Sequence, residues 1–193
     1  MLLADYIEYK LLKTFNQGAS KTCTAYAFFA VLIEFIQQKY GLDVKFDIPR
    51  YFNEVEQWRG KQSRIAAFMA YGTQVGYRDS RGVTWKIKGS NSVAVTDRLL
   101  LLKTLQQYPA IIIIRRFEGH NLNDNVLKPV KRNAKEKAVG HAMLLRGFDL
   151  AKRQYIFQNS YGKKAPQFMP FDVWDSIGKS IWYFTDIYFI TQK

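Results

Sequence analysis

The chain has 193 residues, 48% of them apolar and 16% aromatic, and its 29 basic and 16 acidic residues give a formal net charge of +13. This length suits one domain or two closely packed lobes, and the apolar content excludes a disordered chain. The positive charge favours acidic partners through long-range steering but does not bear on the fold.

The first half of the chain is predicted to be mainly helical. Residues Cys23 to Tyr40 are rich in Ala, Phe, Leu and Ile, and Gly41 follows them. This pattern is typical of a buried helix that ends at a glycine. We expect a second helix over about 63–74 and a third over 95–107, which would end before Pro109.

The second half is predicted to be mainly β-strand. Residues 110–115 include four consecutive isoleucines, which is typical of a buried strand. Residues 141–148 and 154–158 predict two more strands joined by a turn, and residues 181–191 are expected to complete the sheet. Residues 121–139 show little periodicity and are expected to form a long exposed loop.

Helices followed by strands indicate an α+β protein. We interpret residues 1–193 as a single domain with two lobes. The helical lobe is expected to span about 14–108 and the β lobe about 109–193.

Cysteine content and the N-terminal sequence predict the compartment. Cys23 is the single cysteine, so no disulfide can form within the chain. We recognise no signal peptide, and no apolar run is long enough to span a bilayer. We therefore expect a cytoplasmic or other reducing compartment and no membrane partner, with delivery into a host cell or association with a virion left open.

Cys23 is the first candidate functional residue because it begins the predicted buried helix. A lone cysteine is ordinarily a small buried hydrophobe. The N-terminus of a helix, however, favours an anion, and the thiolate is the reactive form of cysteine. Ser20 and Thr22 are suitable capping residues just upstream. This position makes Cys23 a candidate nucleophile.

A thiolate nucleophile needs a base, and the chain contains only His120 and His141. His120 lies in a polar segment, whereas His141 starts an apolar strand, which holds an imidazole better. A purely structural role for His141 stays open at this point. Asn159 ends the next strand, where a hairpin would bring it beside His141. Gln17, six residues before Cys23, offers a side-chain amide to a developing oxyanion.

Three segments together resemble the papain-like cysteine peptidases. The segment NQGASKTCTAYAFFAVLIE (16–34) resembles the family's nucleophile segment, NQGxCGSCWAFSAxxxxE. GHAMLLRGFD (140–149) resembles its histidine segment, and QNSYG (158–162) resembles its KNSWG. The resemblance implies a papain-like two-lobed fold, with an N-terminal helical lobe, a C-terminal antiparallel β-barrel-like lobe, and the active site in the cleft between them.

The resemblance also implies roles for individual residues. Cys23 would be the nucleophile, His141 the acid/base, Asn159 the residue that orients His141, and Gln17 the oxyanion donor. Tyr161 would replace the tryptophan that shields the Asn–His hydrogen bond. The implied activity is that of a cysteine endopeptidase acting on protein or peptide substrates through an acyl-enzyme, and we expect no cofactor and no metal.

The chain departs from the family pattern around the substrate. Lys21 stands where the family has glycine, and would either narrow the cleft or contact an acidic substrate. The glycine pair that binds the substrate backbone is not evident, and Gly60 is its nearest counterpart. Val139 and Ala142 match positions that, in relatives, line the pocket for the substrate residue before the scissile one. Both are small or apolar, so we expect this pocket to prefer an apolar substrate side chain.

The absence of a disulfide cysteine and of a recognisable pro-segment suggests a divergent microbial or viral member. Other interpretations stay open: a catalytically silent papain-like scaffold, another Cys–His amide hydrolase, or a transglutaminase. Basic residues cluster at 128–137. Because no nucleic-acid motif accompanies them, we expect a solvated basic face or a site for an acidic partner or larger assembly, such as a viral one, and no nucleic acid.

Overall fold

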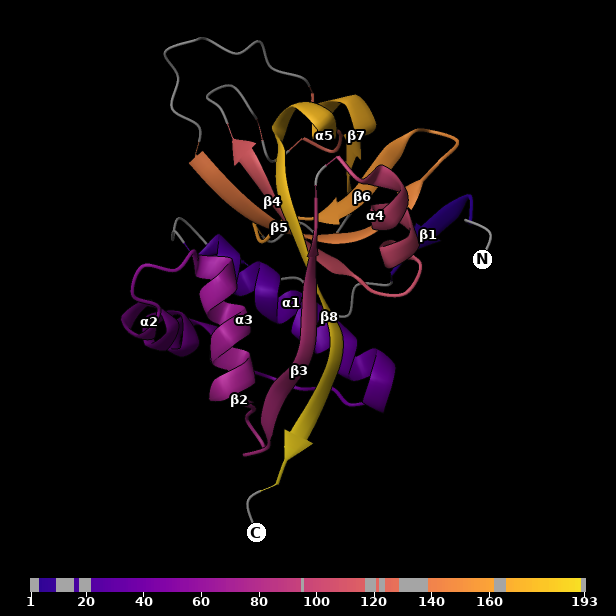
Figure 1. The fold of residues 1–193 in the computed structure, drawn as a ribbon. Helices are drawn as coiled ribbons and strands as arrows, with labels where there is room; N and C mark the ends of the chain where they lie inside the picture. Colours follow the sequence, from indigo (N-terminus) through magenta and orange to yellow (C-terminus); the bar gives the residue numbers. More distant parts are fainter. Residues whose placement is uncertain are drawn as a thin grey trace.

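The computed structural model describes residues 4–9, 16–17, 22–94, 96–116, 121, 124–128, 139–161 and 166–191. These residues form five helices and one eight-stranded antiparallel sheet (Figure 1). The helices are α1 (Cys23–Tyr40), α2 (Ile48–Trp58), α3 (Arg64–Gln74), α4 (Arg98–Leu105) and α5 (Phe171–Ile177). The strands are β1 (Tyr6–Glu8), β2 (Tyr77–Arg78), β3 (Thr84–Val93), β4 (Ala110–Arg116), β5 (Val139–Asp149), β6 (Gln154–Gln158), β7 (Gln167–Pro170) and β8 (Gly178–Ile190).

The sheet has the order β2-β3-β8-β4-β5-β6-β7, with β1 paired to the far end of β5. In Figure 1 the long antiparallel strands β3 and β8 extend through the lower part of the molecule beside α1 and α3, while β4 to β7 lie above with α4 and α5. The predicted α+β class and the antiparallel pairing are confirmed. Strand pairing among the described residues leaves the sheet open and does not close it into a barrel.

Helix α1 has the predicted bounds, because local signals define both its core and its end. Gly41 adopts the left-handed conformation with φ of 68°, and its amide donates to the carbonyl oxygen of Gln37 at 2.9 Å. A glycine pays no steric penalty there. Nearly every side chain from Thr24 to Ile36 is buried, so α1 lies inside the molecule.

Two apolar clusters lie on opposite faces of the sheet, and β4 contributes to both. Ile111 and Ile113 contact the cluster that includes α1 and α3, whereas Ile112 and Ile114 belong to the cluster under α4 and α5. This alternation follows from the two-residue period of a strand. A strand that is apolar on both sides is therefore buried on both sides, as its run of isoleucines predicted.

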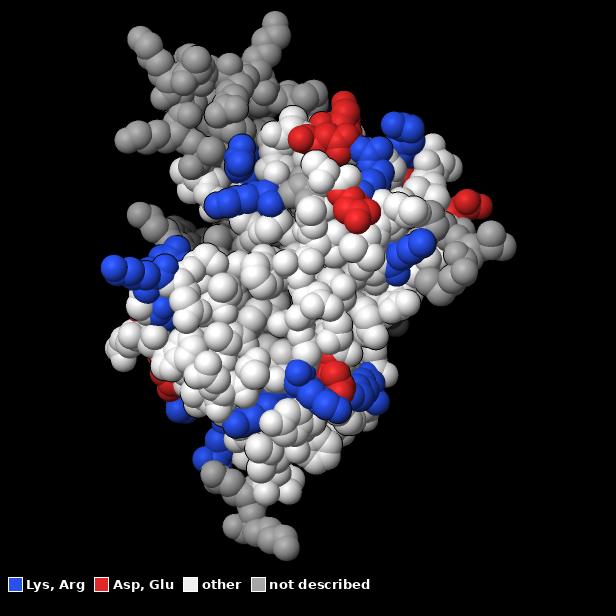
Figure 2. Space-filling view, viewed as in Figure 1, with Lys and Arg blue, Asp and Glu red and all other residues white. Residues whose placement is uncertain are grey.

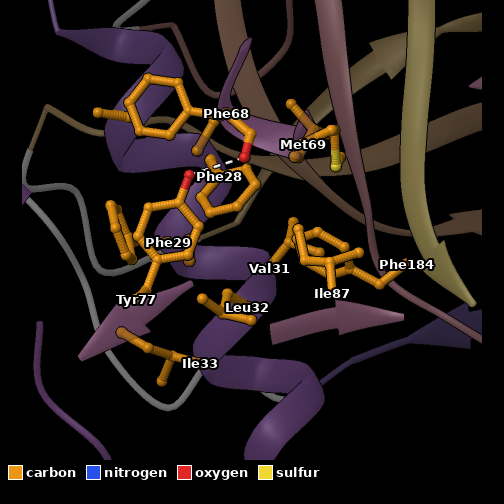
Figure 3. Packing of buried hydrophobic residues seen from close by; sticks show 14 of the residues in the cluster. Phe28, Phe29, Val31, Leu32, Ile33, Phe68, Met69, Tyr77, Ile87 and Phe184 are labelled. Atoms are coloured by element: carbon orange, nitrogen blue, oxygen red, sulfur yellow. Dashed lines mark hydrogen bonds between the residues drawn. The ribbon is translucent and has the colours of Figure 1, made fainter. Parts of the chain in front are cut away.

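The first cluster is rich in aromatic rings (Figure 3). The ring of Phe28 lies 5.1 Å from those of Phe68 and Tyr77 and 5.4 Å from that of Phe184. The buried Tyr77 hydroxyl donates to the carbonyl oxygen of Phe68 at 2.7 Å, so its polar atom is satisfied. This packing joins α1 and α3 to β2 and β8 and holds the start of α1 against the sheet.

A buried carboxylate organises the turn between β2 and β3. Asp79 accepts hydrogen bonds from the Arg81 guanidinium at 2.6 Å, the Trp85 indole at 3.0 Å, and the amides of Arg81 and Val83. Burial alone would raise the pKa of Asp79. The hydrogen bonds from Arg81, Trp85 and the backbone outweigh burial and hold this pKa below its ordinary value.

Several elements were not predicted. Helix α2 begins after Asp47, whose side chain accepts from the amide of Arg50 at 3.1 Å. Strands β1, β2, β3 and β7 and helix α5 were also missed, so the first half holds more strand than expected. Helix α4 is shorter than the predicted 95–107. Most of the predicted loop 121–139 lies outside the described residues, and its last residue begins β5.

No helix in the described ranges combines the length and the apolar character needed to cross a membrane. Cys23 is a free thiol.

Candidate active site

Cys23 is the first residue of α1, which packs against β5. Its thiol is half-buried and contacts the aromatic cluster that α1 shares with the sheet. Because the first amides of a helix have no partner within the helix, this end of α1 favours a negative charge. The packing of α1 therefore fixes the Cys23 thiol at the N-terminal end of this helix.

His141 and Asn159 are brought together by the pairing of β5 with β6. Leu144 pairs with Gln158, so Asn159, just past the end of β6, lies beside the start of β5. His141 Nε2 lies 3.0 Å from Asn159 Oδ1, and the side chains are 5% and 2% exposed. The same oxygen accepts from the Ser160 amide at 2.9 Å. Because an amide oxygen only accepts, we assign the ring hydrogen to Nε2, which leaves Nδ1 as the ring nitrogen that can accept a proton.

The ring of Tyr161 stacks on that of His141, with centroids 5.6 Å apart and planes inclined by 10°. Tyr161 is itself partly exposed. The Tyr161 ring therefore covers one face of the His141 imidazole.

Gln17 is buried and is held by Ser160 through two contacts. The backbone N–H of Gln17 donates to the Ser160 carbonyl oxygen at 2.8 Å, and the Ser160 hydroxyl donates to the side-chain oxygen Oε1 of Gln17. These contacts direct Oε1 towards Ser160 and the Nε2 donor away from it. Ser160 lies next to Asn159 in the chain, so one short segment positions both amide side chains. Sequence reasoning did not identify Ser160, because only the fold brings it to Gln17.

A pocket of about 430 Å³ lies beside His141. Thr24, the neighbour of Cys23, and Ile65 line it from the helices, and Val139 and Ala142 line it from β5. The start of α1 and the start of β5 thus border the same pocket.

Comparison with solved structures identifies the architecture. Xylellain, a cysteine protease from Xylella fastidiosa, superposes with a TM-score of 0.78 at 14% identity, over 95% of this chain and 86% of that one. The Carica candamarcensis cysteine protease CMS1MS2, in complex with E-64, gives 0.73 at 12% identity, over 95% and 99%. Procathepsin B S9 from Trypanosoma congolense gives 0.74 at 10% identity, over 96% and 78%. The chain has the papain-like fold. At the level of sequence, no protein-family model and no curated protein matches it.

Some residues to which the sequence analysis assigned a role do not line this pocket. Gly60 lies in the turn between α2 and α3 with φ of 55°, and is not among the described residues that line the pocket. Lys21 and His120 lie outside the described residues. Of the basic cluster at 128–137, only Lys128 is described.

In the part of the chain that the structure describes, no three His, Cys, Asp or Glu side chains are grouped so as to hold a metal ion.

Proposed function

We propose that the chain is a cysteine endopeptidase in which Cys23, His141 and Asn159 act as a catalytic triad and Gln17 as an oxyanion donor. The observation that carries the proposal is the buried 3.0 Å hydrogen bond between His141 Nε2 and Asn159 Oδ1. In a papain-like fold, this bond leaves Nδ1 of the His141 ring to exchange a proton with a thiol at the start of α1.

The reaction would begin with attack of the Cys23 thiolate on a peptide carbonyl carbon. The carbonyl oxygen would gain a negative charge, stabilised by Gln17 Nε2 and the Cys23 amide, and one such donor is typically worth about 10²–10³ in rate. The imidazolium of His141 would give its proton to the leaving amine as the C–N bond breaks. A water molecule would then attack the thioester, lose its proton to His141, and release the acid and the thiolate.

Asn159 and Tyr161 would act through His141. Asn159 keeps the ring in one orientation and stabilises the hydrogen on Nε2, as the third member of such triads does. Tyr161 would exclude water from that bond. Ser160 would orient the Gln17 amide, so the segment from Asn159 to Tyr161 would control both the base and the oxyanion donor.

The test is proteolysis of a denatured protein, with the peptides identified by mass spectrometry. We expect wild type to release peptides, Cys23→Ala to release none, and His141→Ala to be slower by about 10²- to 10⁴-fold. His120→Ala is the matched control and should retain activity. If folded wild-type protein releases no peptide, a catalytically silent scaffold is the better account. Cleavage of a peptidoglycan fragment, or transfer of an amine to glutamine, without proteolysis would indicate another Cys–His enzyme.

A further inference from the structure

The pocket beside His141 has apolar walls but a cationic lining. Ile65, Ile113 and Ala142 supply apolar surface from three different elements. The lining also includes Arg64 and Lys179, whereas none of its described residues is Asp or Glu. In Figure 2, Lys and Arg side chains appear above and beside the upper end of α3. An apolar preference therefore describes only part of this pocket.

The two cations differ in what they already contact. Arg64 Nε lies 2.9 Å from Glu56 Oε1, and the guanidinium lies over the Phe52 ring at 5.6 Å. The charge of Arg64 is thus largely offset by a carboxylate of the chain. Lys179 is exposed and forms no ion pair with any residue that the structure describes. Among the residues that the structure describes, no carboxylate offsets the charge of this pocket cation.

Backbone irregularity accounts for the position of Lys179. Ile113 of β4 pairs with Ser180, but Ile114 pairs with Gly178, so Lys179 has no partner across the two strands. Such a β-bulge turns a side chain away from regular alternation, and bulges are common next to active sites. The bulge lies where β8 passes the pocket, which is the position from which Lys179 lines it.

We propose that this pocket binds an acidic side chain of the substrate and that Lys179 determines this specificity. The proposal rests on the peptidase function proposed above and names its substrate class. Glutamate is favoured over aspartate, because its additional methylene contacts the apolar wall formed by Ile113 and Ala142. The positive net charge of the chain attracts such substrates over longer distances.

The expected discrimination follows from the exposure of Lys179. An exposed ion pair favours the charged ligand over its neutral isostere by about two- to fivefold. Glutamate should therefore exceed glutamine by that factor at low ionic strength, and the ratio should fall as salt screens the charges. In Lys179→Glu the attraction becomes repulsion, so glutamine should exceed glutamate.

Binding to an inactive background tests the pocket independently of catalysis. Fluorescein-labelled peptide pools, with Glu or Gln fixed at the position before the scissile residue, are titrated by fluorescence anisotropy into Cys23→Ala. The same titrations use Cys23→Ala carrying Lys179→Glu, and Cys23→Ala carrying Lys103→Glu as the control. Lys103 is an exposed lysine on α4, so its reversal makes the same change in net charge away from the pocket.

A Glu preference that reverses with Lys179→Glu and persists with Lys103→Glu supports the proposal. Equal affinity for the two pools, binding of neither pool, or the same change in both reversal variants overturns it. Cleavage of the same pools by the Cys23-containing protein separates the two proposals. Charge-selective binding without cleavage refutes the peptidase function but supports an acidic ligand for the pocket. Cleavage without charge selectivity supports the peptidase function but refutes the acidic preference.

Discussion

Replacing Asn159 with alanine removes the acceptor that holds the His141 ring. Both side chains are buried, and the 3.0 Å bond to Asn159 Oδ1 is the contact that fixes which ring nitrogen carries the hydrogen. In Asn159→Ala the ring loses this acceptor, so its orientation and tautomer are held less strongly. The Ser160 amide, 2.9 Å from the same oxygen, loses an acceptor as well.

The magnitude follows from the burial of these groups. A buried donor left without an acceptor costs about 1–3 kcal/mol. If the transition state loses one such hydrogen bond, kcat/KM for Asn159→Ala falls about 5- to 140-fold, since 1.4 kcal/mol corresponds to tenfold. The free energy of unfolding is expected to fall by about 2 kcal/mol.

The assay is hydrolysis of a fluorogenic peptide together with urea unfolding. Gln158→Ala is the matched control, because Gln158 is the buried neighbour of Asn159 at the end of β6 and donates to the Asn159 carbonyl oxygen at 3.3 Å. We expect Gln158→Ala to lower stability without lowering kcat/KM. Equal losses of kcat/KM in both variants, or none in Asn159→Ala, would refute an orienting role for Asn159.

Three further changes have defined outcomes. Ser160→Ala releases the Gln17 amide and should lower kcat about two- to tenfold with little change in KM, because an oxyanion donor acts in the transition state. The hydrogen bonds that outweigh burial and lower the pKa of Asp79 stabilise the fold above pH about 4, and this contribution is lost as the pH falls through the lower folded pKa. Asp79→Asn should therefore lower the urea midpoint at pH 7, and its difference from wild type should shrink below pH 4. A Cβ at Gly147 would collide with the carbonyl oxygen of Ile7, so Gly147→Ala should detach β1 and speed proteolysis there while hydrogen exchange in α1 stays slow.

Where a segment's structure is determined by its own residues, the sequence predicted it well. The bounds of α1 and β6 agree with the structure, and β4 is one residue longer than predicted. Gly41 marks the end of α1, and the isoleucines of β4 satisfy two cores at once. Each signal is contained within a few neighbouring residues.

The missed elements depend on distant contacts or on weaker local signals. Strand β3 contains Lys, Ser and Asn, and only Trp85 and Ile87 mark its buried face over the first part. A register shift at Gly89 interrupts its alternation, so its pairing with β8 defines it. Helix α2 does carry local signals for its start, namely Asp47 as a cap and Pro49 in the first turn.

The residues of the candidate site were proposed from the resemblance of three segments to the papain-like peptidases. Cys23, His141 and Asn159 each lie in one of these segments, and the structure shows a hydrogen bond between His141 and Asn159. Neither Ser160 nor Lys179 was identified. Their places depend on a contact across the fold and on a bulge between β4 and β8, neither of which has a signature in neighbouring residues.

The most direct measurement of the central claim is intact-mass analysis after treatment with E-64, the epoxide-class inhibitor bound in the Carica protease. The account predicts one adduct on wild type, none on Cys23→Ala, and much slower labelling of His141→Ala. A folded wild-type protein that remains unlabelled, although its thiol still reacts with a small disulfide reagent, would contradict the claim that Cys23 and His141 form an activated pair.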